Sequence, residues 1–200
     1  MENFNYDSYC GIYCGSCDIL ISYKTGIMRK LAIFWNESTV RKFQKITGAV
    51  QTNQPYAVQC HGCKSDQLFI NCSSCKIREC AINKKVEHCF ECAEYPCKYI
   101  NNFQKGDVVL SHLKNNRANL EFIKKNGVQA WLADQEKKWQ CPDCSTSFSW
   151  YTPKCENCGK DLKGKSKSFS LFKSSLMKLS IYLAPNKKKG KVNVRSNGSG

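Results

Sequence analysis

The chain has 200 residues, and 42% of them are hydrophobic by a broad definition that includes 15 cysteines, so the apolar core is modest for this length. The formal net charge is +15, but residues 163–200 contain ten Lys or Arg and no acid, which leaves an excess of only five positive charges on residues 1–162. This distribution argues against a nucleic-acid-binding surface on the body of the protein and places the basic character in the C-terminal tail.

The cysteine content raises the question of redox state. No run of about 18 apolar residues is present, so no membrane span is expected. The first residues lack the basic and apolar regions of a signal peptide, and an odd number of cysteines does not pair completely into disulfides. We therefore expect a cytoplasmic protein whose thiols are reduced and mostly bound to metal.

The first motif is Cys10-x3-Cys14-x2-Cys17. Its spacing is that of the radical SAM iron–sulfur motif, but that enzyme class requires a large α/β barrel, and a second cysteine-rich block follows instead. We expect these three thiols to be metal ligands, completed by a cysteine or histidine of that block. The alternatives are an iron–sulfur cluster with a fourth thiolate, or buried structural thiols.

Three helices are expected next. The first spans Asp18–Lys24 and ends at Gly26, and the second is a buried apolar helix over Ile27–Trp35. The third spans Thr39–Thr47, with Ser38 as its N-cap and Gly48 at its end.

The densest cysteine block lies between residues 60 and 97, where the pattern C-x2-C-x4-C occurs twice. Two thiols separated by two residues can reach one ion through a tight turn, because Zn–S bonds are about 2.3 Å long. The spacing therefore predicts metal ligation by Cys60, Cys63, Cys75, Cys80, Cys89, Cys92 and Cys97. The pairing of thiols into sites cannot be deduced, and whether Cys72, His61, His88 or His112 are ligands stays open.

Helices and a second cysteine motif follow the block. Segments near Val108–Lys114, over Arg117–Lys125 and over Val128–Lys138 are expected to be helical. Two C-x2-C pairs then stand ten residues apart, which is the pattern of a zinc ribbon built from short hairpins. Its predicted ligands are Cys141, Cys144, Cys155 and Cys158, with a strand formed by Phe148, Trp150 and Tyr151.

The C-terminal part changes to a composition rich in Lys and Ser. Phe169, Phe172, Leu176, Leu179 and Leu183 recur at helical spacing, so an amphipathic helix is expected that ends at Pro185. Such a helix can bind a membrane surface or nucleic acid, or it can pack its apolar face on its own domain.

The order of these motifs resembles the uncharacterised cysteine-rich family catalogued as domain of unknown function 3795. The resemblance covers roughly residues 5–140 and is carried by Tyr9–Cys17, Cys60–Cys63, Cys75–Ala81, Glu87–Cys97 and Asn119–Gln135. Many members are similar to this chain in carrying a ribbon after position 139, whereas a cysteine at position 72 is not typical. The resemblance implies a metal-binding fold and supplies no substrate.

Together these patterns predict a small, mostly α, metal-stabilised cysteine-rich domain of zinc knuckles and helices over 1–139, followed by a β zinc ribbon over 140–162. A basic amphipathic helix over 163–185 and a disordered basic tail over 186–200 complete the expected organisation. No Gly-rich phosphate loop, nucleophile with a positioned base or H-E-x-x-H motif is visible, which favours a non-enzymatic protein.

The leading functional hypothesis is a zinc-binding protein with two or three structural Zn²⁺ sites, which acts as an interaction module. Its ribbon and basic tail would bind a protein or nucleic acid, and residues 168–184 offer a route to a membrane surface. The alternative is an iron–sulfur protein with a redox or sensing function, whose cluster is held by the N-terminal cysteines.

Overall fold

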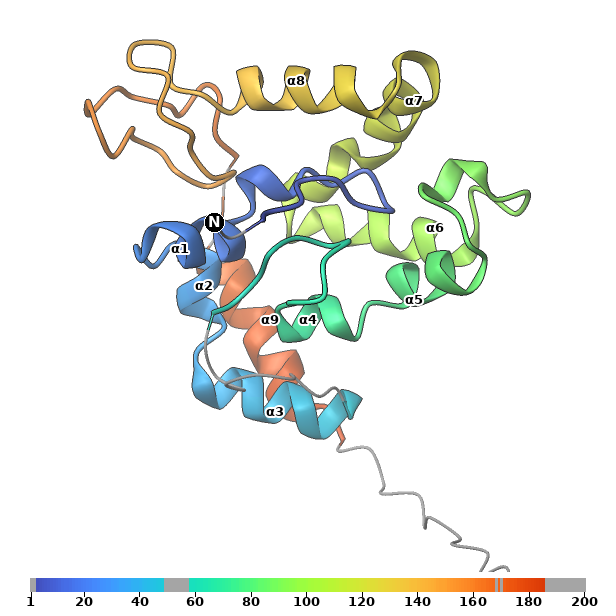
Figure 1. Cartoon of the computed structure of the whole chain (residues 1–200). Helices are drawn as coiled ribbons and strands as arrows, with labels where there is room; N and C mark the ends of the chain where they lie inside the picture. Colours follow the sequence, from blue (N-terminus) through green and yellow to red (C-terminus); the bar gives the residue numbers. More distant parts are fainter. Residues whose placement is uncertain (1–2, 49–57, 168, 170, 186–200) are drawn as a thin grey trace, which may run out of the picture.

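The computed structural model describes residues 3–48, 58–167, 169 and 171–185. These residues form helices joined by long loops (Figure 1). The α-helices are α1 Asp18–Thr25, α2 Lys30–Phe34, α3 Glu37–Thr47, α4 Ile70–Ser73, α5 Lys76–Asn83, α6 Lys98–Lys105, α7 Asn116–Asn126, α8 Val128–Lys138 and α9 Leu171–Leu183. Short 3₁₀ turns are η1 Cys14–Ser16, η2 Cys89–Glu91, η3 Gly106–Val108 and η4 Ser111–Asn115.

The β part of the expected fold class is wrong. The described residues contain no β-strand, and residues 140–162 form loops with two isolated antiparallel bridges, Gln140–Ser147 and Lys154–Asp161. The reason lies at Trp150, whose backbone bonds to other parts of the chain. Its N–H donates to the Ser16 carbonyl at 3.0 Å, and its carbonyl accepts from the Lys167 N–H at 2.6 Å.

Hydrophobic packing joins residues 140–162 to the rest of the molecule. Phe148, Trp150 and Tyr151 are buried in one hydrophobic cluster with Tyr13 and with Trp131 of α8. In Figure 1 the loops that follow α8 lie near α1. The aromatic residues that suggested a strand are buried because they fill this contact, and each buried aromatic side chain contributes about 1.5–3 kcal/mol.

Two further hydrophobic clusters organise the N-terminal part. One joins α1, α2 and α3 to the loop before α4 through Leu20, Phe34, Val40 and Phe69. The other is small, and its buried members are Cys10, Ile77 and Ile100. Thiols pack against both of these clusters, so the N-terminal core depends on its cysteines as much as on its aliphatic residues.

Two helix boundaries differ from the expected ones. The α2 helix is shorter than Ile27–Trp35, because Arg29 is extended and donates its N–H to Ser22 Oγ at 2.9 Å, which leaves Ile27 exposed. The α3 helix begins earlier than expected. Asn36 is its N-cap, and its side chain accepts a hydrogen bond from the Thr39 N–H at 3.1 Å.

The α9 helix packs on α3 and exposes most of its expected apolar face. Met177 and Ile181 contact the hydrophobic cluster of α1–α3. Phe172 is 73% exposed and Leu183 is 74% exposed, and Leu176 and Leu179 are also exposed. Within the described residues, no helix combines the length and the hydrophobicity that crossing a bilayer requires.

Candidate metal centres

Four sulfur atoms converge near the C-terminal end of the described chain. The Sγ atoms of Cys141, Cys144, Cys155 and Cys158, named here the C-terminal site, all lie within 4.8 Å of one another. Cys141 Sγ is 3.6 Å from Cys158 Sγ, and Cys144 Sγ is 3.5 Å from Cys155 Sγ. Tetrahedral Zn–S bonds of about 2.3 Å separate sulfurs by roughly 3.8 Å. The C-terminal site can therefore hold one metal ion.

Two similar backbone turns present these thiols. In the first turn the Ser145 N–H bonds to the Cys141 carbonyl at 2.9 Å, and in the second the Gly159 N–H bonds to the Cys155 carbonyl at 3.0 Å. Ser145 and Gly159 both have positive φ, 56° and 75°. The left-handed residue reverses the chain directly after each C-x2-C pair, which directs both thiols of a pair to the same side.

The C-terminal site is anchored to the N-terminal helices. The buried guanidinium of Arg29, which precedes α2, forms an ion pair with Glu156, between Cys155 and Cys158. Arg29 also donates to Thr25 Oγ1 at 2.9 Å. The sequence gives no signal for this contact, because the two residues are 127 positions apart.

A first group of thiols lies between α1 and α4. It consists of Cys14, Cys17, Cys60, Cys63 and Cys72, and is named the first thiol group. Burial, together with the facing thiols of Cys63 and Cys17, raises the pKa of Cys14 well above its ordinary value. Burial and the facing Cys60 raise the pKa of Cys17 to about 12. Removing these thiols from water disfavours their thiolate forms, which a metal cation would stabilise.

Backbone hydrogen bonds bring the first thiol group together. The Asn5 N–H donates to the His61 carbonyl at 2.7 Å, and the Cys14 N–H donates to the Tyr6 carbonyl at 2.9 Å. The N-terminal segment therefore places Cys14 beside the loop that carries Cys60. Such long-range pairing is invisible in the spacing of the cysteines.

Cys72 belongs to the first thiol group, although the sequence left its role open. Burial raises its pKa well above the ordinary value, and the facing thiols of Cys60 and Cys63 raise it further. Its place in the first C-x2-C-x4-C repeat was the signal that could have included it.

A second group of thiols lies beside α5 and α6. It consists of Cys10, Cys75, Cys80, Cys89 and Cys97, and is named the second thiol group. The Cys89 N–H donates to the Tyr9 carbonyl at 2.8 Å, which brings η2 beside Cys10. Burial and the facing Cys75 raise the pKa of Cys10 to about 11. Cys10 faces Cys75, and Cys14 and Cys17 face Cys60. Cys63 of the first thiol group also faces Cys10 and Cys75, so the two groups adjoin at this thiol.

The thiols of these two groups are spaced more widely than those of the C-terminal site. In the part of the chain that the structure describes, the C-terminal site alone brings three or more ligand atoms within 4.8 Å of one another. All 15 cysteines are free thiols. The structure thus assembles one single-ion site, together with two looser thiol groups.

The histidines have partners other than cysteine thiols. His88 Nε2 lies 3.0 Å from both Asp7 carboxylate oxygens, and Lys64 Nζ lies 2.7 Å from Asp7 Oδ2. Although burial raises the pKa of Asp7, its hydrogen bonds with His88 and Lys64 lower that pKa below the ordinary value. His112 stacks on Trp150 with ring centroids 3.9 Å apart. His61 packs edge-on against Phe4 at 5.1 Å between centroids.

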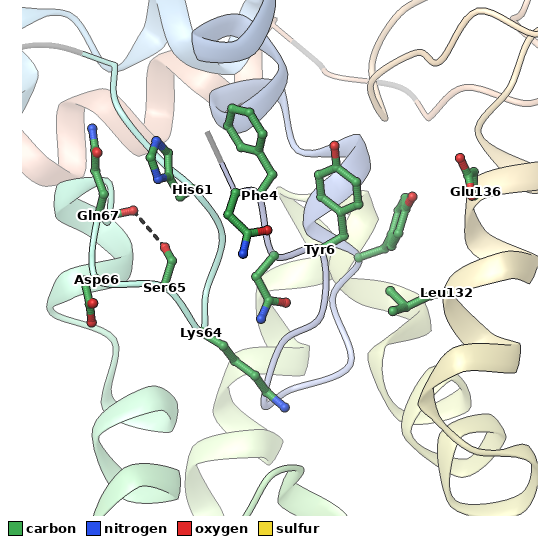
Figure 2. A pocket seen from close by; sticks show the side chains of 12 residues that line it. Phe4, Tyr6, His61, Lys64, Ser65, Asp66, Gln67, Leu132 and Glu136 are labelled. Atoms are coloured by element: carbon green, nitrogen blue, oxygen red, sulfur yellow. Dashed lines mark hydrogen bonds between the residues drawn. The ribbon is translucent and has the colours of Figure 1, made fainter. Parts of the chain in front are cut away.

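A separate open cleft of about 680 Å³ lies between the N-terminal segment, the loop before α4 and α8. Figure 2 shows His61 and Gln67 on one side of it, Phe4 and Tyr6 in the middle, and Leu132 and Glu136 on the other side. The cationic side chain of Lys64 lines this cleft, and its Nζ also lies 3.0 Å from Glu87 Oε2. No thiol lines this cleft.

Comparison with known proteins finds one family similar to the N-terminal part of the chain. Residues 6–102 match the family model described as "Protein of unknown function (DUF3795)". The match covers both thiol groups and stops before the C-terminal site. Neither a curated protein nor a solved structure matches the chain.

Proposed function

We propose that the protein is a metal-stabilised interaction protein in which the C-terminal site binds one Zn²⁺ with a structural role. The observation that carries the proposal is the convergence of four sulfurs within 4.8 Å. Four thiolates in a tetrahedral arrangement favour zinc, and they leave no position open for a substrate.

Binding of zinc would hold residues 140–162 in place. These residues have no sheet of their own, and they are otherwise held by two isolated bridges, the buried aromatic residues, the ion pair of Glu156 with Arg29 and the backbone hydrogen bonds of Trp150. A structural zinc contributes an apparent ~10–16 kcal/mol at neutral pH, which is as large as the whole stability of an ordinary domain. Release of the ion would therefore free the segment that carries Trp150 and Tyr151.

The test is zinc analysis of the full chain, purified without oxygen. The wild type is expected to carry one more zinc per chain than the C144S and C158S variants, and both variants should expose Trp150 to solvent, as measured by fluorescence. The C92S variant is the matched control and should keep this zinc. Equal zinc contents in wild type and C144S would refute the proposal.

A second candidate function is peripheral binding to an anionic membrane surface through α9. Its support is the exposed apolar side formed by Phe172, Leu176, Leu179 and Leu183, followed in sequence by the basic run from Lys187 to Lys191. Exposed apolar residues next to lysines are typical of helices that lie in the membrane interface.

Co-sedimentation with vesicles that contain phosphatidylserine tests this candidate. L179E and L183E are expected to abolish sedimentation, because each places a charge in the apolar face. I33E is the control, since Ile33 is equally exposed but lies on α2. Unchanged sedimentation of L179E, or equal binding to vesicles without anionic lipid, would rule out the candidate.

A further inference from the structure

Four thiols outside the C-terminal site line a single cavity of about 370 Å³. They are Cys80 of α5, Cys89 of η2, Cys92 directly after η2, and Cys97 directly before α6. The cavity is named the thiol cavity. Much of the remaining wall is apolar and includes Ile77, Val86 and Ile100.

The spacing of these thiols does not suit a single ion. Around one tetrahedral Zn²⁺ the sulfurs would be roughly 3.8 Å apart, yet among the described residues no three thiols of the thiol cavity lie within 4.8 Å of one another. In a [4Fe–4S] cluster each thiolate binds a different iron, so the four sulfurs stand farther apart than they do around one ion.

The volume of the thiol cavity leads to the same conclusion. A water molecule occupies about 30 Å³ in the liquid, so a cavity of about 370 Å³ is many times larger than one ion requires. A [4Fe–4S] core contains eight iron and sulfide atoms and therefore needs a larger cavity than one ion does. Four surrounding cysteines are its usual ligands.

Hydrogen-bond donors at the sulfur of Cys92 suit a negatively charged cluster. The Glu94 N–H lies 3.4 Å from Cys92 Sγ, and the Lys84 ammonium lies 3.5 Å from it. Lys98 also lines the thiol cavity, as does Glu94, whose carboxylate forms an ion pair with Lys84. Such donors stabilise electron density on the sulfurs and raise the reduction potential of an iron–sulfur cluster.

We propose that the thiol cavity binds a [4Fe–4S]-type iron–sulfur cluster, with Cys80, Cys89, Cys92 and Cys97 as its four ligands. This site is distinct from the expected cluster of Cys10, Cys14 and Cys17, because none of these three thiols lines the thiol cavity. The proposal does not depend on zinc at the C-terminal site, because the two sites share no ligand.

The experiment uses the full chain, purified without oxygen and reconstituted with ferrous iron and sulfide. We expect broad visible absorption, and iron and acid-labile sulfide in equal amounts. C92S and C97S are expected to lose about four iron and four sulfide per chain, the content of one such cluster. C144S is the matched control, because Cys144 belongs to the C-terminal site and does not line the thiol cavity, so this variant should keep the iron and sulfide.

Each outcome decides the proposal. Zinc without iron or sulfide after reconstitution of the wild type would overturn it, and this result requires no variant to fold. Retention of the visible absorption by C92S and C97S, or its loss in C144S alone, would also overturn it. A third variant, K84M, should keep the iron and sulfide content and lower the reduction potential, which a purely structural role of Lys84 would leave unchanged.

Discussion

Ser145 and Gly159 occupy equivalent positions in the two turns of the C-terminal site, and substitutions there test its geometry. Both residues have positive φ, 56° and 75°. A left-handed conformation costs a residue with a side chain about 1–2 kcal/mol, and the greater unfolded-state entropy of glycine offsets about 0.4–1 kcal/mol of this difference. A Cβ added at Gly159 meets no atom within 4 Å, so backbone strain alone decides the effect.

We therefore expect S145G to stabilise the folded, zinc-bound chain by about 0.5–1 kcal/mol, and G159A to destabilise it by a similar amount. Because zinc binding is coupled to the fold of the turns, the same free energy changes the apparent Kd for zinc. The expected change is about two- to fivefold in each case, with opposite signs.

Competition with a chromophoric zinc chelator, at fixed pH and with the full chain, measures this Kd. G164A is the control, because Gly164 has ordinary φ and open surroundings, so its zinc affinity should not change. A shift of S145G and G159A in the same direction would refute the reasoning. So would a G159A variant that behaves like G164A.

Three further predictions concern the packing around the metal centres. E156Q should lower the free energy of unfolding by about 1–3 kcal/mol in urea, because it leaves the buried Arg29 guanidinium without its carboxylate; E37Q, in an exposed pair, should change it by less than about 0.5 kcal/mol. G62A would place a Cβ 1.7 Å from a backbone carbonyl oxygen, so its thermal midpoint should fall sharply, and an unchanged midpoint would contradict the described loop. Burial lowers the pKa of His112 to about 3. The unfolded chain then binds a proton below about pH 6.5 that the folded chain does not, so stability should fall by up to about 1.4 kcal/mol per pH unit towards pH 3. H112Q should lose this part of the slope, and an equal slope in both chains would exclude it.

The sequence was informative where the interactions are local. Periodicity predicted Val128–Lys138, and α8 has these bounds. The C-x2-C spacing predicted one site formed by Cys141, Cys144, Cys155 and Cys158. This prediction was possible because each pair lies on its own short turn. A site whose ligands come from two neighbouring turns can be predicted without knowing the rest of the fold.

The expected strand shows where local reasoning failed. Phe148, Trp150 and Tyr151 have high strand propensity, but propensity records packing on a half-buried surface as much as a backbone preference. Here Tyr13 and Trp131 provide that surface, so the three aromatic residues are buried without the hydrogen-bond ladder of a β-sheet. In α9, too, the surrounding surface decides which residues are buried. The side that packs on the rest of the protein contains Met177 and Ile181, whereas Phe172, Leu176, Leu179 and Leu183 of the expected apolar face are exposed.

The division of the N-terminal cysteines could not be read from their spacing at all. Cys10 and Cys14 are four residues apart, yet Cys10 faces Cys75 and Cys14 faces Cys63, which lies beside both Cys10 and Cys75. The cause is the extended N-terminal segment, which bonds to His61 at Asn5 and to Cys89 at Tyr9. A segment held between two partners places successive cysteines on opposite sides, and only the tertiary structure specifies those partners.

The metal centres differ in how closely metal binding must be coupled to folding. At the C-terminal site two short turns already gather the four sulfurs. Hydrogen bonds with Thr146 lower the pKa of Cys144 below its ordinary value. At Cys158 a backbone hydrogen bond with Lys160 lowers the pKa, but the neighbouring thiols raise it above the ordinary value. In the thiol groups the ligands come from segments far apart in sequence, and burial raises the pKa of Cys17 to about 12 and that of Cys89 to about 12. A buried thiol can remain neutral as a small apolar group, whereas a buried thiolate requires a cation. Metal binding at the N-terminal groups would therefore have to remove protons and fix long-range contacts in one step, so it would be coupled to folding more closely than at the C-terminal site.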